Sequence, residues 1–296
     1  MKGPKVGPFV NILLLLRAIR WYNIGLLGLS QYLIAFYVFN LHENAYLFLS
    51  DYKLHFIVLS TTCAVAGAFI INGFYDVDKD LINRPESVVF SRLLSQNYLL
   101  NTYVILNVFS VGFALFASYK VFIFSTILTF LFWFYSHKLQ KIPVIRELTA
   151  SLLAISPIIA VWLHYLNMHY GLLIYICSLL VVGFTREVVK DLNGNKGNII
   201  FGYKTVVVAA GKKFTRQWLF SICLLSATAF FFGTTLFYPH LNYFTLISGF
   251  SLATALVVSL ACLLSKDETF YFIADSFLKV AIVIHIASLV AIPYLG

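Results

Sequence analysis

Residues Leu54 to Glu86 read LHFIVLSTTCAVAGAFIINGFYDVDKDLINRPE. The stretch begins with an apolar run from Leu54 to Tyr75, which is long enough to cross the ~30 Å hydrocarbon core of a bilayer as one helix. Three aspartates, Asp76, Asp78 and Asp80, follow this run, in a chain of 296 residues that contains only 12 acidic side chains. Charge at membrane depth is costly, so ionisable side chains there are a functional site by default. The stretch therefore predicts a membrane helix with a functional polar end.

The composition extends this prediction to the whole chain. Hydrophobic residues make up 60% and charged residues 11%, and the mean hydropathy is +0.87, whereas a soluble domain has roughly a quarter of its residues charged. We expect an all-α, multi-pass integral membrane protein, with one membrane domain over residues 1–296. Nine apolar segments predict nine spans: Phe9–Asn40, Leu54–Tyr75, Tyr98–Ser118, Val121–Tyr135, Leu148–Leu166, Tyr170–Phe184, Trp218–Tyr238, Tyr243–Ser265 and Phe270–Leu295.

Three details qualify this arrangement. The first segment is overlong and carries Arg17 and Arg20, so we expect an interfacial turn before the true span. The fourth and sixth segments are short, and both can extend into the polar stretch that follows. The four cysteines fall inside spans without a CxxC pair, which predicts small packing residues and neither disulfides nor a zinc site.

The basic residues predict the orientation. With nine spans, nearly all of the 21 Lys and Arg residues fall at the N-terminus or in the loops after the even-numbered spans. The exceptions are Lys53 and Lys120 on the other side and Lys279 within the last span. Because basic loops stay cytoplasmic, we expect the N-terminus and the motif loops in the cytoplasm. Topology and anionic lipid headgroups account for the +9 net charge, so we expect membrane lipid and no nucleic acid as a partner.

The aspartates at the end of the second span have a helical spacing. Asn72, Asp76 and Asp80 lie at i, i+4 and i+8, so they share one helix face, whereas Asp78 lies on another. Several carboxylates on one face repel each other unless a cation lies between them. Paired oxygen ligands of this kind suit Mg²⁺, which takes a few carboxylates together with substrate phosphate oxygens.

These residues carry a resemblance. NGFYDVDKDLINRPE resembles the NxxxDxxxD signature of the UbiA-type intramembrane prenyltransferases, with the INRP extension that usually follows it. Three further stretches agree with that family in order and spacing, and the wording is most similar to the branch that makes digeranylgeranylglyceryl phosphate. They are RWYN (20–23), YSHKLQKIP (135–143) and REVVKDLNGNKGNIIFGYKTV (186–206).

The resemblance implies a nine-helix bundle that transfers a polyprenyl group from a polyprenyl diphosphate donor to a small-molecule acceptor. The acceptor would be a glyceryl phosphate or a quinone precursor, and Mg²⁺ would be the cofactor. The implied catalytic residues are Asp76, Asp80 and Asp191. The implied metal ligands are Asn72, Asp76, Asp80, Glu187 and Asp191, and the implied diphosphate contacts are Asn72, Arg84, Lys138 and Lys190.

The chain also departs from the family pattern. Gly194 and Asn198 stand where the second motif usually has aspartates, Gly73 replaces a common Asp, and Arg146-Glu147 replaces a usual Gly-Asn. The carboxylates that remain, Glu187 and Asp191, are spaced i, i+4. The second metal site is therefore weak, rebuilt from these two residues, or absent.

Three alternatives stay open at this point. Asp191 can be a helix-end carboxylate paired with Lys190 or Arg186. The eroded second motif also fits a degenerate relative that binds isoprenoid or lipid without turning it over. A transporter would place ionisable residues at mid-membrane, where Asp275 and Lys279 form an i, i+4 pair that can neutralise itself.

Overall fold

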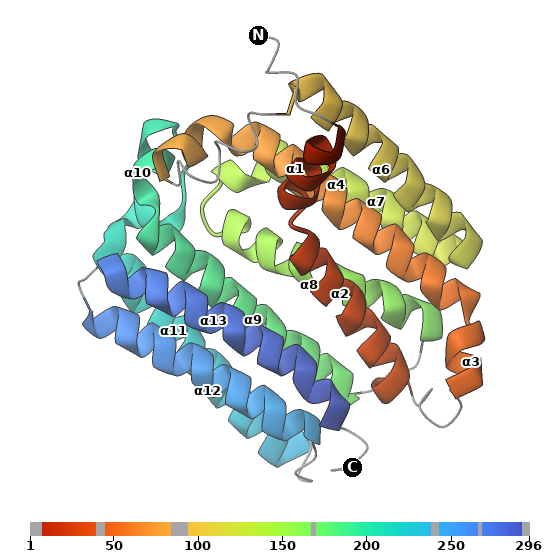
Figure 1. The fold of residues 1–296 in the computed structure, drawn as a ribbon. Helices are drawn as coiled ribbons and strands as arrows, with labels where there is room; N and C mark the ends of the chain where they lie inside the picture. The colour runs from red at the N-terminus through yellow and green to blue at the C-terminus, as the bar shows by residue number, and fades with distance from the viewer. Residues whose placement is uncertain are drawn as a thin grey trace. The chain divides into compact units, whose positions relative to one another are not determined.

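The computed structural model describes residues 8–39, 45–83, 94–166, 170–237, 243–265 and 268–291. Within these ranges it contains helices and no strand (Figure 1). The α-helices are α1 (Pro8–Ala18), α2 (Trp21–Leu33), α3 (Ala45–Ser50), α4 (Tyr52–Asn83), α6 (Gln96–Ala117), α7 (Tyr119–His137), α8 (Ile145–Tyr165), α9 (Tyr170–Asn193), α10 (Asn195–Ile200), α11 (Val206–Phe237), α12 (Tyr243–Leu264) and α13 (Glu268–Ala287). A π-helical segment, η1 (Ile34–Val38), extends α2, and short 3-10 turns η3 (Leu139–Lys141) and η4 (Ser288–Ala291) follow α7 and α13.

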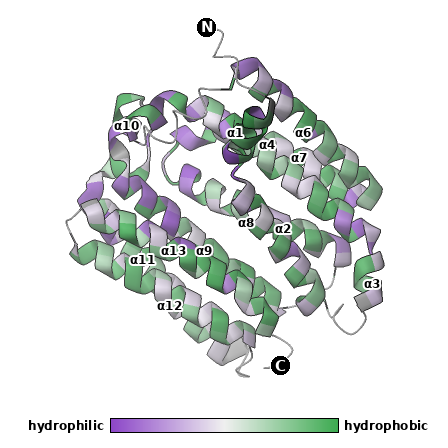
Figure 2. Cartoon of the chain, viewed as in Figure 1, coloured by the Kyte–Doolittle hydropathy of each residue, from purple (hydrophilic) through white to green (hydrophobic). Residues whose placement is uncertain are grey.

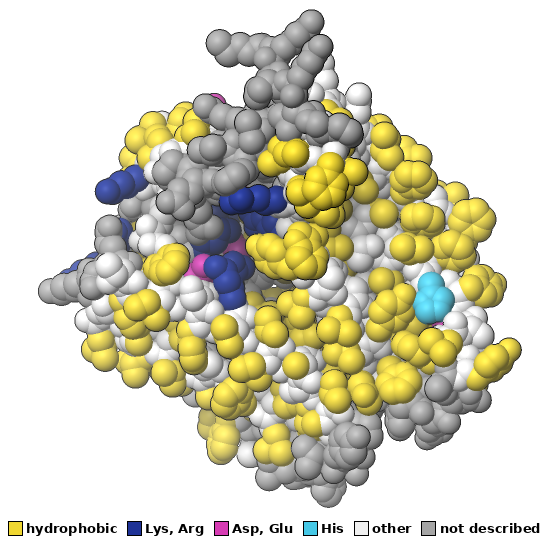
Figure 3. Space-filling model, viewed as in Figure 1, with side chains coloured by type: hydrophobic (Ala, Val, Ile, Leu, Met, Phe, Trp, Pro, Cys, Tyr) yellow, Lys and Arg dark blue, Asp and Glu magenta, His cyan; other side chains and the backbone are white. Residues whose placement is uncertain are grey.

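The helices have the length and composition of membrane spans. In the described part of the chain, eight helices are long and apolar enough to cross a bilayer, and α1 with α2–η1 forms a ninth candidate that is bent by 59°. In Figure 2, green hydrophobic residues predominate along the long helices. In Figure 3, hydrophobic side chains cover much of the molecular face that is shown. Large apolar side chains such as Phe109, Phe116 and Leu225 are exposed, as expected where lipid is the solvent. The prediction of an all-α membrane protein with about nine spans is confirmed.

Two expectations about the span boundaries are confirmed, and one boundary differs. The first segment begins with the separate helix α1, and the chain bends at Arg20, which adopts the left-handed conformation (φ 54°). As expected for the short sixth segment, helix α9 continues past Phe184 to Asn193, because Val188, Val189 and Leu192 are buried and keep one face of its polar end packed. Helix α11, in contrast, begins at Val206, ahead of the predicted Trp218, and is kinked at Gly211. That glycine has φ 80°, a conformation that residues with a Cβ adopt at a cost.

The helices group into two compact units. Among the described residues, the first unit contains α1–α4, α6, α7 and the part of α8 from Ser156 onward. The second contains α8 up to Ile155 and α9–α13. All four cysteines are free.

Helix α4 is the centre of the first unit, where it packs against α2, α6 and α7 (Figure 1). A chain of buried serines joins three of these helices: Ser60 and Ser125 are 2.9 Å apart at their hydroxyls, and Ser125 and Ser110 are 3.0 Å apart. A Cβ on Gly67 would lie 3.5 Å from Tyr103 on α6. Small and hydroxyl side chains allow close packing and interhelical hydrogen bonds in membranes, and here they fix the orientation of α4.

Helix α9 has the same role in the second unit, where it packs against α11, α12 and α13 (Figure 1). Val188 and Leu192 of α9 form a buried cluster with Leu219 of α11 and Leu278 of α13. This packing holds the last two turns of α9, which carry Glu187 and Asp191, at a fixed rotation. Each unit therefore holds one of the two predicted acidic motifs on a buried helix.

Candidate active-site residues

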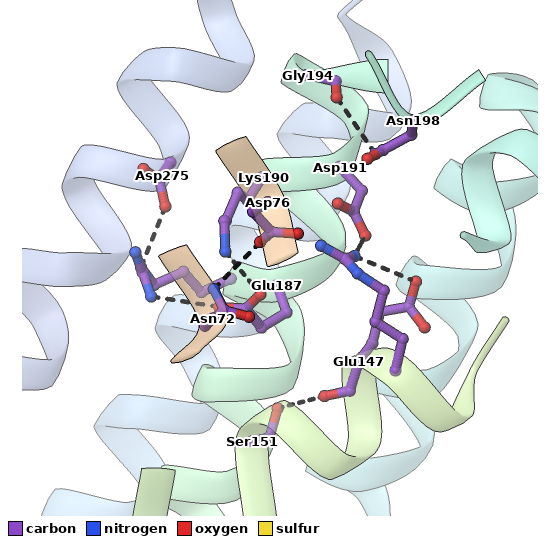
Figure 4. A network of polar contacts seen from close by, with 12 residues as sticks. Asn72, Asp76, Glu147, Ser151, Glu187, Lys190, Asp191, Gly194, Asn198 and Asp275 are labelled. Carbon is purple, nitrogen blue, oxygen red and sulfur yellow. Dashed lines mark hydrogen bonds and ion pairs between the residues drawn. The ribbon is translucent and has the colours of Figure 1, made fainter. Parts of the chain in front are cut away.

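The first motif lies on the last turns of α4, in the first unit. The spacing prediction is confirmed, since Asn72, Asp76, Asp78 and Asp80 all lie within one continuous helix. Asn72 Nδ2 donates to Asp76 Oδ2 at 3.1 Å (Figure 4). Lys79 Nζ lies 2.7 Å from Asp76 Oδ1. Asp76 is buried whereas Asp78 is exposed. Burial therefore distinguishes two aspartates that are only two positions apart.

The first motif has the oxygen atoms and the charge that suit a divalent cation. The three aspartates and Lys79 give the end of α4 a net charge of −2. Asn72 Oδ1 is buried and has no hydrogen-bond partner among the described residues, and a buried polar atom without a partner is costly. No group of three or more His, Cys, Asp or Glu residues in the described chain is arranged to enclose a metal alone. The residues therefore suit a divalent cation as part of its coordination shell, which oxygens from outside this helix end would have to complete.

Helix α7 ends beside α4 with the YSHK sequence. Tyr75 and His137 are joined at 3.2 Å between the Tyr hydroxyl and Nδ1, and the His137 ring stacks on Trp133 with centroids 5.2 Å apart. Lys138 follows as the C-terminal cap residue of α7 and is exposed. The sequence did not single out Tyr75 and His137, because a contact between two helices leaves no local spacing signal. Arg84, a predicted diphosphate contact, lies outside the described residues.

The second motif lies at the end of α9, in the second unit, and Arg146 is its partner. Arg146 Nη1 contacts Asp191 Oδ2 (Figure 4). The same nitrogen lies 3.8 Å from Glu147 Oε1. All three residues are buried, with exposed fractions of 4% for Arg146, 1% for Glu147 and 2% for Asp191. Asp191 is therefore a paired carboxylate, as the alternative proposed, but its partner is Arg146 of α8 and neither Lys190 nor Arg186.

Glu147 links α8 to the start of α11. Its Oε1 accepts a hydrogen bond from the Val206 backbone N–H at 3.3 Å, which is one of the N–H groups that a helix start leaves without an internal partner. Glu147 is also in the first turn of α8, where the helix dipole favours negative charge. Ser151 Oγ donates to the Glu147 carbonyl at 2.8 Å. Glu147 thus has a structural role in addition to its contact with Arg146.

A second series of ion pairs in the same unit joins α9 to α13, and Figure 4 shows its Glu187, Lys190 and Asp275. Glu187 contacts Lys190 at 3.0 Å and Arg186 at 3.5 Å. Asp275 of α13 lies 3.1 Å from Arg186 and 2.6 Å from Lys279. The Asp275–Lys279 pair that suggested a transporter is thus part of a paired, neutralised set. Arg146, Arg186 and Asp275 were not predicted as site residues, although the cost of charge at membrane depth implies a partner for each.

The two eroded positions of the second motif are close to each other. Asn198 is 2% exposed, and its Nδ2 donates to the Gly194 carbonyl at 3.3 Å. Gly194 lies between α9 and α10. The amide of Asn198 therefore helps to hold the connection between these helices and brings no charge to it.

Comparison with known proteins gives the family. The chain matches the model of the UbiA prenyltransferase family over residues 14–273. It is 24% identical over 224 residues to the digeranylgeranylglyceryl phosphate synthase of Korarchaeum cryptofilum, covering 76% of this chain and 80% of that protein. It is 31% identical over 154 residues to the synthase of Pyrococcus furiosus, an alignment that covers 50% of this chain and 53% of that one.

Solved structures agree on the fold. A structure described as digeranylgeranylglyceryl phosphate synthase in membranes superposes with a TM-score of 0.69 at 18% identity, covering 95% of this chain and 98% of that one. A UbiA homolog from Archaeoglobus fulgidus bound to GPP and Mg²⁺ gives a TM-score of 0.69 at 15% identity, covering 95% and 100%. No comparison supports the non-catalytic alternative. The chain therefore belongs to the UbiA prenyltransferase family and is an enzyme that transfers prenyl groups, which are alkyl groups other than methyl.

Proposed function

We propose that this enzyme transfers a polyprenyl group from a polyprenyl diphosphate to a glyceryl phosphate acceptor, with Mg²⁺ as its cofactor. The family match supports the reaction class. The similarity to digeranylgeranylglyceryl phosphate synthases over as much as 80% of a relative's length supports the acceptor. A UbiA homolog from Archaeoglobus fulgidus that binds GPP and Mg²⁺ supports the donor and the cofactor. A quinone precursor is the second acceptor to test.

The observation that carries the proposal is the end of α4. A buried Asp76 carboxylate, an Asn72 Oδ1 without a hydrogen-bond partner in the described part of the chain, and a formal charge of −2 occur together at the end of a largely apolar helix. We propose Asn72, Asp76 and Asp80 as the ligands of Mg²⁺, either directly or through water. When bound, Mg²⁺ supplies positive charge to the diphosphate oxygens, on which negative charge develops as the bond to the prenyl carbon breaks.

Side chains of the protein orient the Asp76 carboxylate and balance the negative charge of the diphosphate. Asn72 Nδ2 and Lys79 Nζ both contact the Asp76 carboxylate and hold it in one rotamer, so that little reorganisation is needed when the donor binds. Lys138, Lys190 and Arg84 are proposed to contact the diphosphate, and Asp191 is proposed as the catalytic carboxylate of the second motif. Ligation of a metal by Glu187 and Asp191 stays a prediction from the sequence. Both carboxylates contact basic side chains of the chain itself, as Asp76 contacts Lys79.

The proposed orientation places the N-terminus and the motif loops in the cytoplasm. The distribution of lysine and arginine along the chain supports it, because basic loops are retained on that side. The end of α4 would then lie on the side of the membrane from which Mg²⁺ and the polar diphosphate group of the donor arrive. Membrane lipid would surround the apolar spans.

The test is diphosphate release by the purified protein in the presence of Mg²⁺ and labelled geranylgeranyl diphosphate. One arm offers geranylgeranylglyceryl phosphate and another offers an aromatic quinone precursor. Label transfer to the glyceryl phosphate is the expected result, and transfer to the aromatic acceptor alone would refute the proposed acceptor. Binding of the donor without any diphosphate release would instead make this chain a non-catalytic member of the family. Asp78→Asn is the matched control for Asp76→Asn, since both aspartates lie on α4.

A further inference from the structure

We infer that Arg146 takes the place of a second divalent cation in the second unit, so that the chain binds its metal at the first motif alone. The inference rests on the proposed function, because it concerns how many metal ions assist the proposed prenyl transfer. It assigns Arg146 as a positioning residue, which acts by neutralising Asp191.

The pairing of the carboxylates is the first argument. Four carboxylates have described side chains in the second unit: Glu147, Glu187, Asp191 and Asp275. Each of them lies within ion-pair distance of a basic side chain of the same unit. The basic partners are four in number as well: Arg146, Arg186, Lys190 and Lys279. Among the side chains that the structure describes in this unit, the four carboxylates and their four basic partners are thus balanced in charge.

The position of Arg146 is the second argument. Asp191 is 2% exposed and Arg146 is 4% exposed, so their attraction acts in a medium of low effective dielectric constant. A metal ion on Asp191 would have to displace the guanidinium or bind next to it. Either arrangement places like charges close together in a buried site, which opposes binding of the ion.

The first motif provides the contrast. There, Asp76 also contacts a basic side chain, Lys79. Asp78 and Asp80 lie on the same helix end, so that its three aspartates and one lysine carry a formal charge of −2. In the second unit, Gly194 and Asn198 add no carboxylate, and the Asn198 amide bonds to the Gly194 carbonyl. The two motifs therefore differ in formal charge among the described side chains: −2 for the three aspartates and Lys79 at the end of α4, and zero for the four ion-paired carboxylates of the second unit with their four basic partners.

The experiment counts Mn²⁺ ions per chain on the full-length protein in detergent, by equilibrium dialysis and metal analysis, with and without farnesyl thiodiphosphate as an unreactive donor analogue. We expect one ion for the wild type and one for Asp191→Asn. Arg146→Gly exposes the Asp191 and Glu147 carboxylates to a metal and should bind a second ion. Mn²⁺ should then raise the melting temperature of Arg146→Gly more than that of the wild type.

Two ions in the wild type, with one of them lost in Asp191→Asn, would overturn the inference. If Arg146→Gly does not fold, the Asp191→Asn count still decides between these outcomes, and Arg146→Lys, which keeps the charge, should retain the count of the wild type. Failure of the proposed function has a separate signature. In that case Asp76→Asn would leave the count unchanged and the wild type would release no diphosphate, whatever the Arg146 variants bind.

Discussion

Removal of the Arg146 side chain is the sharpest test of the second unit's electrostatics. Arg146→Ala leaves Asp191 at 2% exposure and Glu147 at 1% exposure without their shared cation. Loss of one partner of a buried ion pair costs about 3–5 kcal/mol, because the remaining charge is buried and uncompensated. At roughly 2–4 °C per kcal/mol for a chain of this size class, the melting temperature should fall by about 6 °C or more.

The assay is thermal unfolding in detergent without divalent metal, for the wild type, both single variants and the double variant. Asp191→Asn in the Arg146→Ala background removes the carboxylate that has lost its partner, so the double variant should be more stable than Arg146→Ala alone. The coupling between the two positions should be on the order of 1–3 kcal/mol, as for residues in direct contact. Additive effects, or an Arg146→Ala variant that melts within about 2 °C of the wild type, would refute the assigned ion pair.

Three further predictions concern the motifs and the topology. Asp76→Ala should abolish diphosphate release, because Asp76 is the buried carboxylate of the first motif, whereas Asp78→Ala on the exposed side of α4 should retain it; equal sensitivity of both would contradict the assigned face. The double variant Gly194→Asp, Asn198→Asp should lower the Mg²⁺ concentration needed for half-maximal activity, since it adds two carboxylates to a charge-balanced region. An unchanged or higher Mg²⁺ concentration for half-maximal activity would count against this charge argument. A reporter fused after Gly296 should be active only when exported; cytoplasmic activity would mean that the number of spans is even.

The sequence alone predicted those features that depend on neighbouring positions. Apolar runs of the required length predicted the membrane class and about nine spans, because burial in lipid acts on each helix separately. The i, i+4 spacing of Asn72 and Asp76 placed them on one face of α4, since helix geometry fixes which neighbours meet. The sequence left open how far α9 extends past Phe184, because the packing of Val188 and Leu192 keeps this polar segment helical. The start of α11 at Val206 was not predicted.

The tertiary structure decided which charges pair. From spacing alone, the available partners of Asp191 are Lys190 and Arg186, its neighbours along α9. The actual partner, Arg146, is 45 positions away on α8, and Arg186 instead contacts Asp275 on α13. Partner choice between helices depends on their relative rotation and depth, which the buried core of α9, α11 and α13 sets. The sequence therefore shows where carboxylates occur along each helix, whereas the helix packing determines which basic side chain neutralises each of them.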